Sequence, residues 1–165
     1  MGLLVMHLDA AYRLARWLLR DETEAEDAVQ EAYLRAFRNF HSLRGGDSRA
    51  WLLAIVRNGC YDRLKRGAVY RHSAFEEQTH ACDRFLNQEL ALLHREKTEQ
   101  ISRALENLPA NLREVLVLRE FEEMSYTQIA TVADIPIGTV MSRLNRARHQ
   151  LKQMVSFDGE AKEIL

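Results

Sequence analysis

The sequence predicts an all-α protein made of two small helical domains joined by a flexible linker. Three observations predict this class. The 165 residues include only two prolines and seven glycines, and no run of alternating β-branched residues indicates a sheet. Along most of the chain, apolar residues recur every three or four positions, which is the period of one buried helix face. Residues 67–100 break this period and are polar, so we place the linker there, between domains at 1–66 and 101–157.

The first domain is expected to contain three helices. The opening segment has one apolar face at helical spacing, formed by Leu8, Ala11, Tyr12, Ala15, Leu18 and Leu19. A second helix is expected to begin between Asp21 and Thr23, where Thr23 and Glu26 fit a capping box. After a polar loop, a third helix is expected to begin with Asp47 or Ser48 as its N-cap.

The second domain ends in a pattern typical of a helix-turn-helix. Ser125 and Gln128 form a second capping box at the start of a short helix, and a tight turn follows at 133–135. A longer helix is expected from Pro136 to Met154, since proline suits a first helical turn. Its core face would be Val140, Leu144, Ala147 and Leu151. Before this motif we expect helices at 101–108 and 111–121, and some helix in the linker near 85–99.

The formal net charge of −1 argues against a nucleic-acid binder, but the distribution of the charges argues for one. Residues 135–157 contain no acidic residue and four basic ones. Residues 57–66 contain four basic residues and only Asp62 as an acid. Two basic stretches therefore lie in a chain that is otherwise neutral to acidic.

The basic final helix is suited to the major groove of duplex DNA. Its residues outside the core face are Ser142, Arg143, Asn145, Arg146 and His149. Asn and Arg side chains can read base edges, whereas Arg148 and Lys152 are placed to contact phosphate. Taken alone, the same pattern also fits a solvated basic helix on a bundle.

The basic stripe Arg57, Tyr61 and Lys65, with Asn58 and Trp51 nearby, suits single-stranded nucleic acid, because a base can stack on a ring while its phosphate meets a cation. From these residues alone, ordinary core aromatics are the better interpretation. The glycine-containing loop at 40–47 could line a pocket for a flipped base, or be simply a turn.

Other side-chain groups give no sign of catalysis or of a bound cofactor. Asp27, Gln30 and Glu31 share a helix face that either is solvated or docks a basic partner. His72, His80, Cys82 and His94 have spacings that fit no standard zinc pattern. We therefore expect no enzyme, no metal and no cofactor.

The two cysteines make no disulfide framework, which favours a reducing cytoplasm. Cys60 lies on an apolar stripe with Leu52, Val56 and Leu64, so we expect it to be buried and inert. The first residues do not form a signal peptide, and no segment reaches the length of a membrane span.

Three stretches, in this order, resemble extracytoplasmic-function (ECF) sigma factors of bacterial RNA polymerase. DETEAEDAVQEAYLRAFRNF resembles their core-binding helix in region 2. SRAWLLAIVRNGCYDRLKR resembles the helix that melts and reads the −10 promoter element. LPANLREVLVLREFEEMSYTQIATVADIPIGTVMSRLNRARHQL resembles region 4, which reads the −35 element.

The resemblance implies a function and a role for each candidate residue. The chain would direct RNA polymerase core to specific promoters and assist their melting, under stress and under an anti-sigma factor that hides both domains. Asp27, Gln30 and Glu31 would face the clamp helices of the β′ subunit. The candidate −10 set, which joins the basic stripe to the loop before it, is His41, Arg44, Arg57, Asn58, Tyr61 and Lys65. The candidate −35 set is Thr139, Ser142, Arg143, Asn145, Arg146 and Arg148.

Two departures from the family pattern bear on these roles. Many relatives have Arg where this chain has Met141, which removes one contact with phosphate or base. The chain also begins close to its first helix. Two alternatives stay open, a sigma-like mimic that sequesters an anti-sigma factor without binding DNA, and a stand-alone helix-turn-helix repressor.

Overall fold

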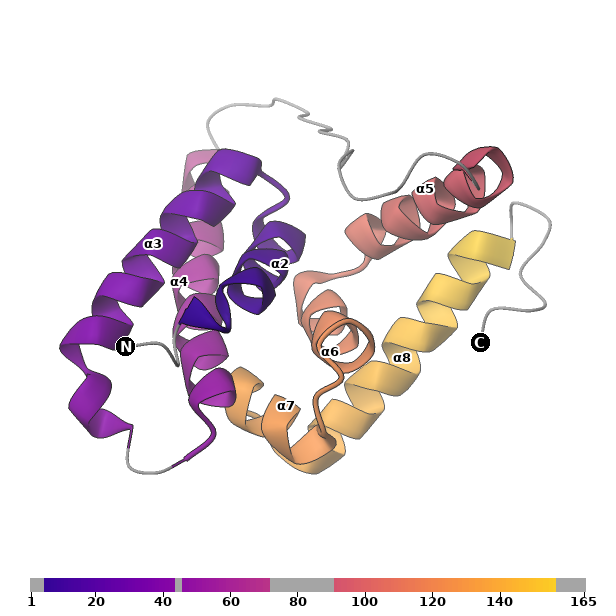
Figure 1. Cartoon of the computed structure of the whole chain (residues 1–165). Coiled ribbons are helices and arrows are strands. Elements are labelled where there is room, and N and C mark those ends of the chain that lie inside the picture. The colour runs from indigo at the N-terminus through magenta and orange to yellow at the C-terminus, as the bar shows by residue number, and fades with distance from the viewer. Residues whose placement is uncertain (1–4, 44–45, 72–90, 157–165) are drawn as a thin grey trace.

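The computed structural model describes residues 5–43, 46–71 and 91–156, and every regular element in these ranges is a helix (Figure 1). In chain order the elements are α2 (Leu8–Leu19), α3 (Glu22–Arg38), the short 3-10 helix η1 (Phe40–Ser42), α4 (Ser48–Arg71), α5 (Ala91–Asn107), α6 (Ala110–Glu120), α7 (Tyr126–Ala133) and α8 (Ile137–Ser156). The all-α prediction is confirmed. No helix among the described residues is long and apolar enough to cross a membrane.

Helices α2, α3 and α4 pack on one another as a bundle. Helix α2 buries Ala11, Ala15 and Leu18 of the predicted face, together with Leu14, which the prediction omitted. Leu8 was expected on this face but is exposed, because it lies in the first turn of the helix. The buried face of α3 consists of small residues, namely Ala25, Ala28, Val29, Ala32 and Ala36. Such small side chains let α3 lie close to both neighbouring helices.

N-cap side chains set the first residue of several helices, and the cap predicted for α3 is wrong. Helix α3 starts one residue after Asp21, whose carboxylate accepts a hydrogen bond from the Glu24 amide at 2.8 Å. Asp21 therefore caps α3, and Thr23 and Glu26 already lie inside the helix. A carboxylate at this position satisfies a free amide and also suits the positive end of the helix dipole.

The other two predicted caps are confirmed. The Asp47 carboxylate accepts from the amides of Arg49 and Ala50 at 3.0 and 3.1 Å, and α4 follows it directly. Ser125 and Gln128 form a complete capping box at the start of α7.

Helices α5 to α8 form the second unit, and α7, the turn after it and α8 give the expected helix-turn-helix. Asp134 closes α7 in the left-handed conformation, at φ 52°. On α8, Val140, Leu144 and Ala147 of the predicted core face are buried, and Leu151 is half-buried. Helix α4 extends to Arg71 and α5 begins at Ala91, so helix occupies both ends of the segment expected to be a linker; residues 72–90 lie outside the described part.

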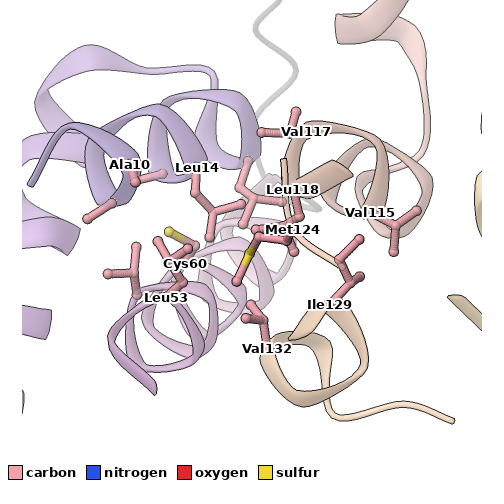
Figure 2. Close-up of a cluster of buried hydrophobic side chains, with 14 of the residues drawn as sticks. Ala10, Leu14, Leu53, Cys60, Val115, Val117, Leu118, Met124, Ile129 and Val132 are labelled. Carbon is pink, nitrogen blue, oxygen red and sulfur yellow. The ribbon is translucent and has the colours of Figure 1, made fainter. Parts of the chain in front are cut away.

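The two units share one hydrophobic core, which the sequence did not predict. Helix α7 packs on α4, and α6 packs on α2. Figure 2 shows Leu14, Leu53 and Cys60 of the first unit facing Leu118, Met124, Ile129 and Val132 of the second, and all are buried. The rings of Trp17 and Phe121 add a tilted contact across the boundary, with centroids 5.9 Å apart. In this structure the second unit is therefore docked on the first.

Candidate nucleic-acid interfaces

Helix α8 presents a polar surface on the side opposite its buried face. Ser142, Asn145 and Arg146 are exposed, and the Thr139 side chain is half-buried beside them. The Ser142 hydroxyl donates to the Thr139 carbonyl at 3.1 Å, which orients it along the helix. Met141 is also exposed, with 55% of its surface accessible, so an apolar side chain interrupts this polar face.

Two arginines of the predicted −35 set are held by carboxylates of the same unit. Arg143 donates to Oε1 of Glu114 at 3.2 Å and its side chain is mostly covered. Arg148 donates to Oε1 of Glu120 at 2.7 Å, and this hydrogen bond raises the pKa of Arg148. These two cations are thus fixed in direction, whereas Arg146 makes no ion pair within the described residues.

The predicted −10 set divides into accessible and covered side chains. His41 on η1 and Asn58 and Lys65 on α4 are exposed, and Arg44 lies outside the described residues. Arg57, by contrast, is turned toward the second unit. Its Nε and Nη2 donate to the Glu114 carboxylate at 2.9 and 3.3 Å.

Tyr61 is covered together with Arg57. The Arg57 guanidinium lies 4.4 Å from the centre of the Tyr61 ring, so the stripe does bring a cation and an aromatic ring together. Burial, and then the Glu114 carboxylate, raise the pKa of the Tyr61 phenol well above its usual value. The sequence predicted that Arg57 and Tyr61 share one helix face. It did not predict that the second unit covers this face.

Glu114 and Glu122 are two charged residues that sequence reasoning missed. Both side chains are fully buried. Glu122 receives Arg13 Nε at 2.7 Å and Nη2 at 3.3 Å, and it also pairs with Arg49. For Glu114, the observation that points to an internal role is its position on α6, where every residue from Leu112 to Leu118 is buried. A helix covered all round leaves no exposed face for Glu114, so that carboxylate needs partners inside the protein.

The predicted acidic face is exposed on α3 and continues into an apolar surface. Asp27, Gln30 and Glu31 are all exposed. One and two turns further along, Leu34 and Phe37 are each 59% exposed. Glu31 pairs with Arg63 at 2.9 Å, which fixes that carboxylate on the surface. The combination of acid and exposed apolar side chains is typical of a protein-binding surface.

No group of His, Cys, Asp or Glu side chains among the described residues is arranged to hold a metal ion. His72, His80 and Cys82, and the side chain of His94, lie outside the described part. Cys60 is fully buried, and this burial raises the pKa of its thiol to about 12. The predicted burial of Cys60 is therefore confirmed.

Comparison with known proteins identifies the family. The model of Sigma-70 region 2 matches residues 3–69, and the model of Sigma-70 region 4 matches residues 98–151. The RNA polymerase sigma-H factor of Pseudomonas aeruginosa is 36% identical over 142 residues, which cover 81% of this chain and 74% of that protein. The ECF RNA polymerase sigma-E factor of Escherichia coli is 34% identical over 141 residues, covering 80% and 74%. The chain belongs to the ECF sigma factor family. Sigma factors are transcription initiation factors, not enzymes.

The ECF sigma factor SigE of Mycolicibacterium smegmatis is 30% identical over 151 residues. They cover 91% of this chain and 59% of SigE, so this sigma factor spans less than two thirds of that relative.

Solved sigma factors resemble the whole arrangement of this one. RpoE of Bartonella quintana, solved with the anti-sigma factor NepR, matches with a TM-score of 0.78 and 29% identity, covering 94% of this chain and 95% of RpoE. CnrH, solved with the cytosolic domain of CnrY, matches with a TM-score of 0.64 and 26% identity, covering 96% and 88%. The match to RpoE covers 94% of this chain and so spans both the unit that contains region 2 and the unit that contains region 4.

Proposed function

We propose that this sigma factor directs RNA polymerase core to specific promoters and assists their melting during transcription initiation. The observation that carries the proposal is the free polar face of α8, which presents Ser142, Asn145 and Arg146 on the second helix of a capped helix-turn-helix. A helix in this position enters the major groove of duplex DNA in proteins with this motif. The polymerase supplies the chemistry, so the sigma factor needs no cofactor of its own. Region 2 is assigned to residues 1–66 and region 4 to 101–157, joined through 67–100.

Region 4 would read the −35 element. The proposed contact residues are Thr139, Ser142, Arg143, Asn145, Arg146 and Arg148. Exposure supports base reading by Asn145 and Arg146, whose side chains suit adenine and guanine edges. Arg143 and Arg148 are held by Glu114 and Glu120, so their part is to orient the helix and to meet phosphate.

Region 2 would hold the displaced strand of the −10 element. The proposed contact residues are His41, Arg44, Arg57, Asn58, Tyr61 and Lys65. His41, Asn58 and Lys65 are accessible in this structure. Arg57 and Tyr61 can take part only after region 4 has moved away from them.

The α3 surface would dock on the clamp helices of the β′ subunit. Asp27, Gln30 and Glu31 supply acid and amide groups that complement a basic partner. Exposed Leu34 and Phe37 would bury apolar area at the same contact, which is where binding energy concentrates in protein interfaces.

An anti-sigma factor is the second proposed partner, in the cytoplasm and under stress control. The structural neighbours RpoE and CnrH are sigma factors solved with NepR and CnrY. The docked arrangement of regions 2 and 4 is consistent with a partner that holds both regions at once.

The decisive experiment is transcription in vitro with purified core polymerase and a library of genomic fragments. We expect discrete start sites that require this sigma factor and that weaken with Arg146→Ala. Arg103→Gln is the matched control, because Arg103 is exposed on α5 and pairs with Glu99 of the same helix. If no fragment yields sigma-dependent initiation, the proposal fails.

The second candidate is a sigma-like mimic that sequesters an anti-sigma factor without binding DNA. The coverage of Arg57 and Tyr61 by region 4 favours it over an enzyme or a free repressor. A pull-down with core polymerase separates the two functions, since a mimic needs no polymerase contact. Retention of the wild-type chain and its loss with Asp27→Lys would support the sigma factor.

A further inference from the structure

Two buried carboxylates of region 4 bind arginines of region 2. Both partners of Glu122 come from region 2, namely Arg13 on α2 and Arg49 on α4. Glu114 is shared between Arg57 of region 2 and Arg143 of its own region. The arginine side chains reach in from the surface, since those of Arg13 and Arg49 are 47% and 33% exposed while that of Glu122 is 0% exposed.

Two further polar contacts and the shared apolar core also join region 4 to region 2. Gln128 donates to the Asp47 carboxylate at 2.6 Å, so the residue that completes the α7 capping box also touches the residue that caps α4. Arg20 lies 3.6 Å from Glu106 at another point of the boundary. The shared apolar core favours contact between the two regions but does not fix their relative orientation. The buried ion pairs fix it, because each carboxylate must meet its arginine partners.

We propose that Glu114 and Glu122 form an autoinhibitory latch, which holds region 4 on region 2 and withholds Arg57 and Tyr61 from DNA until polymerase or the promoter separates the regions. The withholding part rests on the proposed −10 role of these two residues; the latch itself does not. Opening hydrates both carboxylates and exchanges the Glu114 contact of Arg57 for a phosphate contact. The two states therefore compete for one guanidinium group, and the fraction of open molecules sets the apparent affinity for DNA.

The test uses the full chain and two variants with opposite changes of charge. Glu122→Gln removes a negative charge and Arg13→Gln removes a positive one, and each breaks the same ion pair. Neither residue belongs to the proposed DNA-binding sets. Arg103→Gln controls for the loss of a cation, because Arg103 is exposed on α5 and pairs with Glu99 of the same helix.

Two readouts are measured, the radius of gyration by small-angle X-ray scattering and the binding of a fluorescent single-stranded oligonucleotide of mixed sequence by anisotropy. We expect both variants to expand relative to wild type and to bind the oligonucleotide about tenfold more tightly, equivalent to ~1.4 kcal/mol. Tighter DNA binding by Arg13→Gln would be the strongest support for the latch, because the loss of a cation by itself weakens binding to DNA. Arg103→Gln should stay compact and bind no better than wild type.

Each of the other possible outcomes contradicts a specific part of the proposal. Wild-type chain as expanded as the variants, or variants as compact as wild type, overturns the latch and leaves the proposed function standing. Tighter binding by Glu122→Gln with weaker binding by Arg13→Gln shows simple charge effects and also overturns it. Expansion without tighter binding overturns the withholding of Arg57 and Tyr61 and counts against their −10 role. If circular dichroism shows Glu122→Gln unfolded, the surface variant Arg13→Gln decides.

Discussion

Arg57 of region 2 and Glu114 of region 4 form a two-point ion pair across the boundary between the two regions, with N–O distances of 2.9 and 3.3 Å. The pair joins a residue expected to contact promoter DNA to a carboxylate that is fully buried. A guanidinium fork matched to a carboxylate is among the stronger polar contacts in proteins. On the proposed −10 role of Arg57, this one side chain would link the DNA-binding state of the sigma factor to its closed state.

Arg146→Ala should weaken promoter recognition without affecting binding to core polymerase. Arg146 is exposed on α8 and free to read a base edge, so we expect a loss of ~1–3 kcal/mol in holoenzyme affinity for its promoter. Gel-shift titration with the promoter and with a scrambled −35 element measures the loss. Lys152→Ala should weaken both DNAs alike, as a phosphate contact does. A parallel fall in core binding for Arg146→Ala would show that its role is misassigned.

Met141→Arg should tighten promoter binding. Met141 is 55% exposed on α8, on the face that we propose contacts DNA, where an added guanidinium could reach phosphate. We expect the slope of log K against log salt to steepen by about 0.9 for one new phosphate contact. Titrations at several salt concentrations measure it, with Met141→Leu as the uncharged control. An unchanged slope would place residue 141 away from the backbone of the DNA.

Glu123→Gly should stabilise the fold. Glu123 has φ 52°, a left-handed conformation that costs a residue with a Cβ about 1–2 kcal/mol. Glycine removes this strain but loses more chain entropy on folding, so we expect a net gain of ~0.5–1 kcal/mol. Urea unfolding measures the free energy. Glu123→Ala removes the charge and keeps the Cβ, so an equal gain from alanine would rule out the backbone explanation.

Asp47 should contribute a pH-dependent share of stability. Burial raises the pKa of this carboxyl, but hydrogen bonds from Ala50, Gln128 and Arg49 outweigh burial and hold the pKa below its usual 3.8. Because the folded pKa is the lower one, the contribution is complete above about pH 4 and is lost as the pH falls through the folded pKa.

The check compares wild type with Asp47→Asn, which keeps an oxygen at the cap and does not titrate. Urea unfolding between pH 5 and pH 3 should show a shallower loss of stability in the variant. Parallel curves for the two proteins would mean that the pKa of Asp47 is the same in the folded and unfolded states.

Cys60 should resist alkylation in the folded protein. Burial raises the pKa of the thiol from 9.0 to about 12. At pH 8 the thiolate fraction then falls about a thousandfold, and the thiolate is the reactive form. Iodoacetamide labelling of the Cys82→Ser protein, followed by mass spectrometry, measures the rate, with the same protein in urea as the control. Rapid labelling of the folded form would mean that the helices around Cys60 open readily.

Much of this protein followed from local patterns in the sequence. The period of apolar residues predicted the helices, and the burial of Val140, Leu144 and Ala147 was confirmed. Capping chemistry predicted Asp47 and Ser125 correctly and failed at α3, where Asp21 begins the helix before the Thr23 box. The spacing of Thr23 and Glu26 favoured threonine as the cap, although aspartate, two positions earlier, is the stronger N-cap residue.

The sequence by itself determined the helices, the helix-turn-helix and the family, because each of these depends on residues that are neighbours along one helix or one turn. Only the tertiary structure decided that region 4 lies on region 2 and that Arg57 faces Glu114 instead of solvent. The physical reason is that such contacts join residues 57 positions apart in sequence, and no local period records which surface meets which. A stripe of Arg57 and Tyr61 looks the same in sequence whether it faces DNA or a second unit of its own chain.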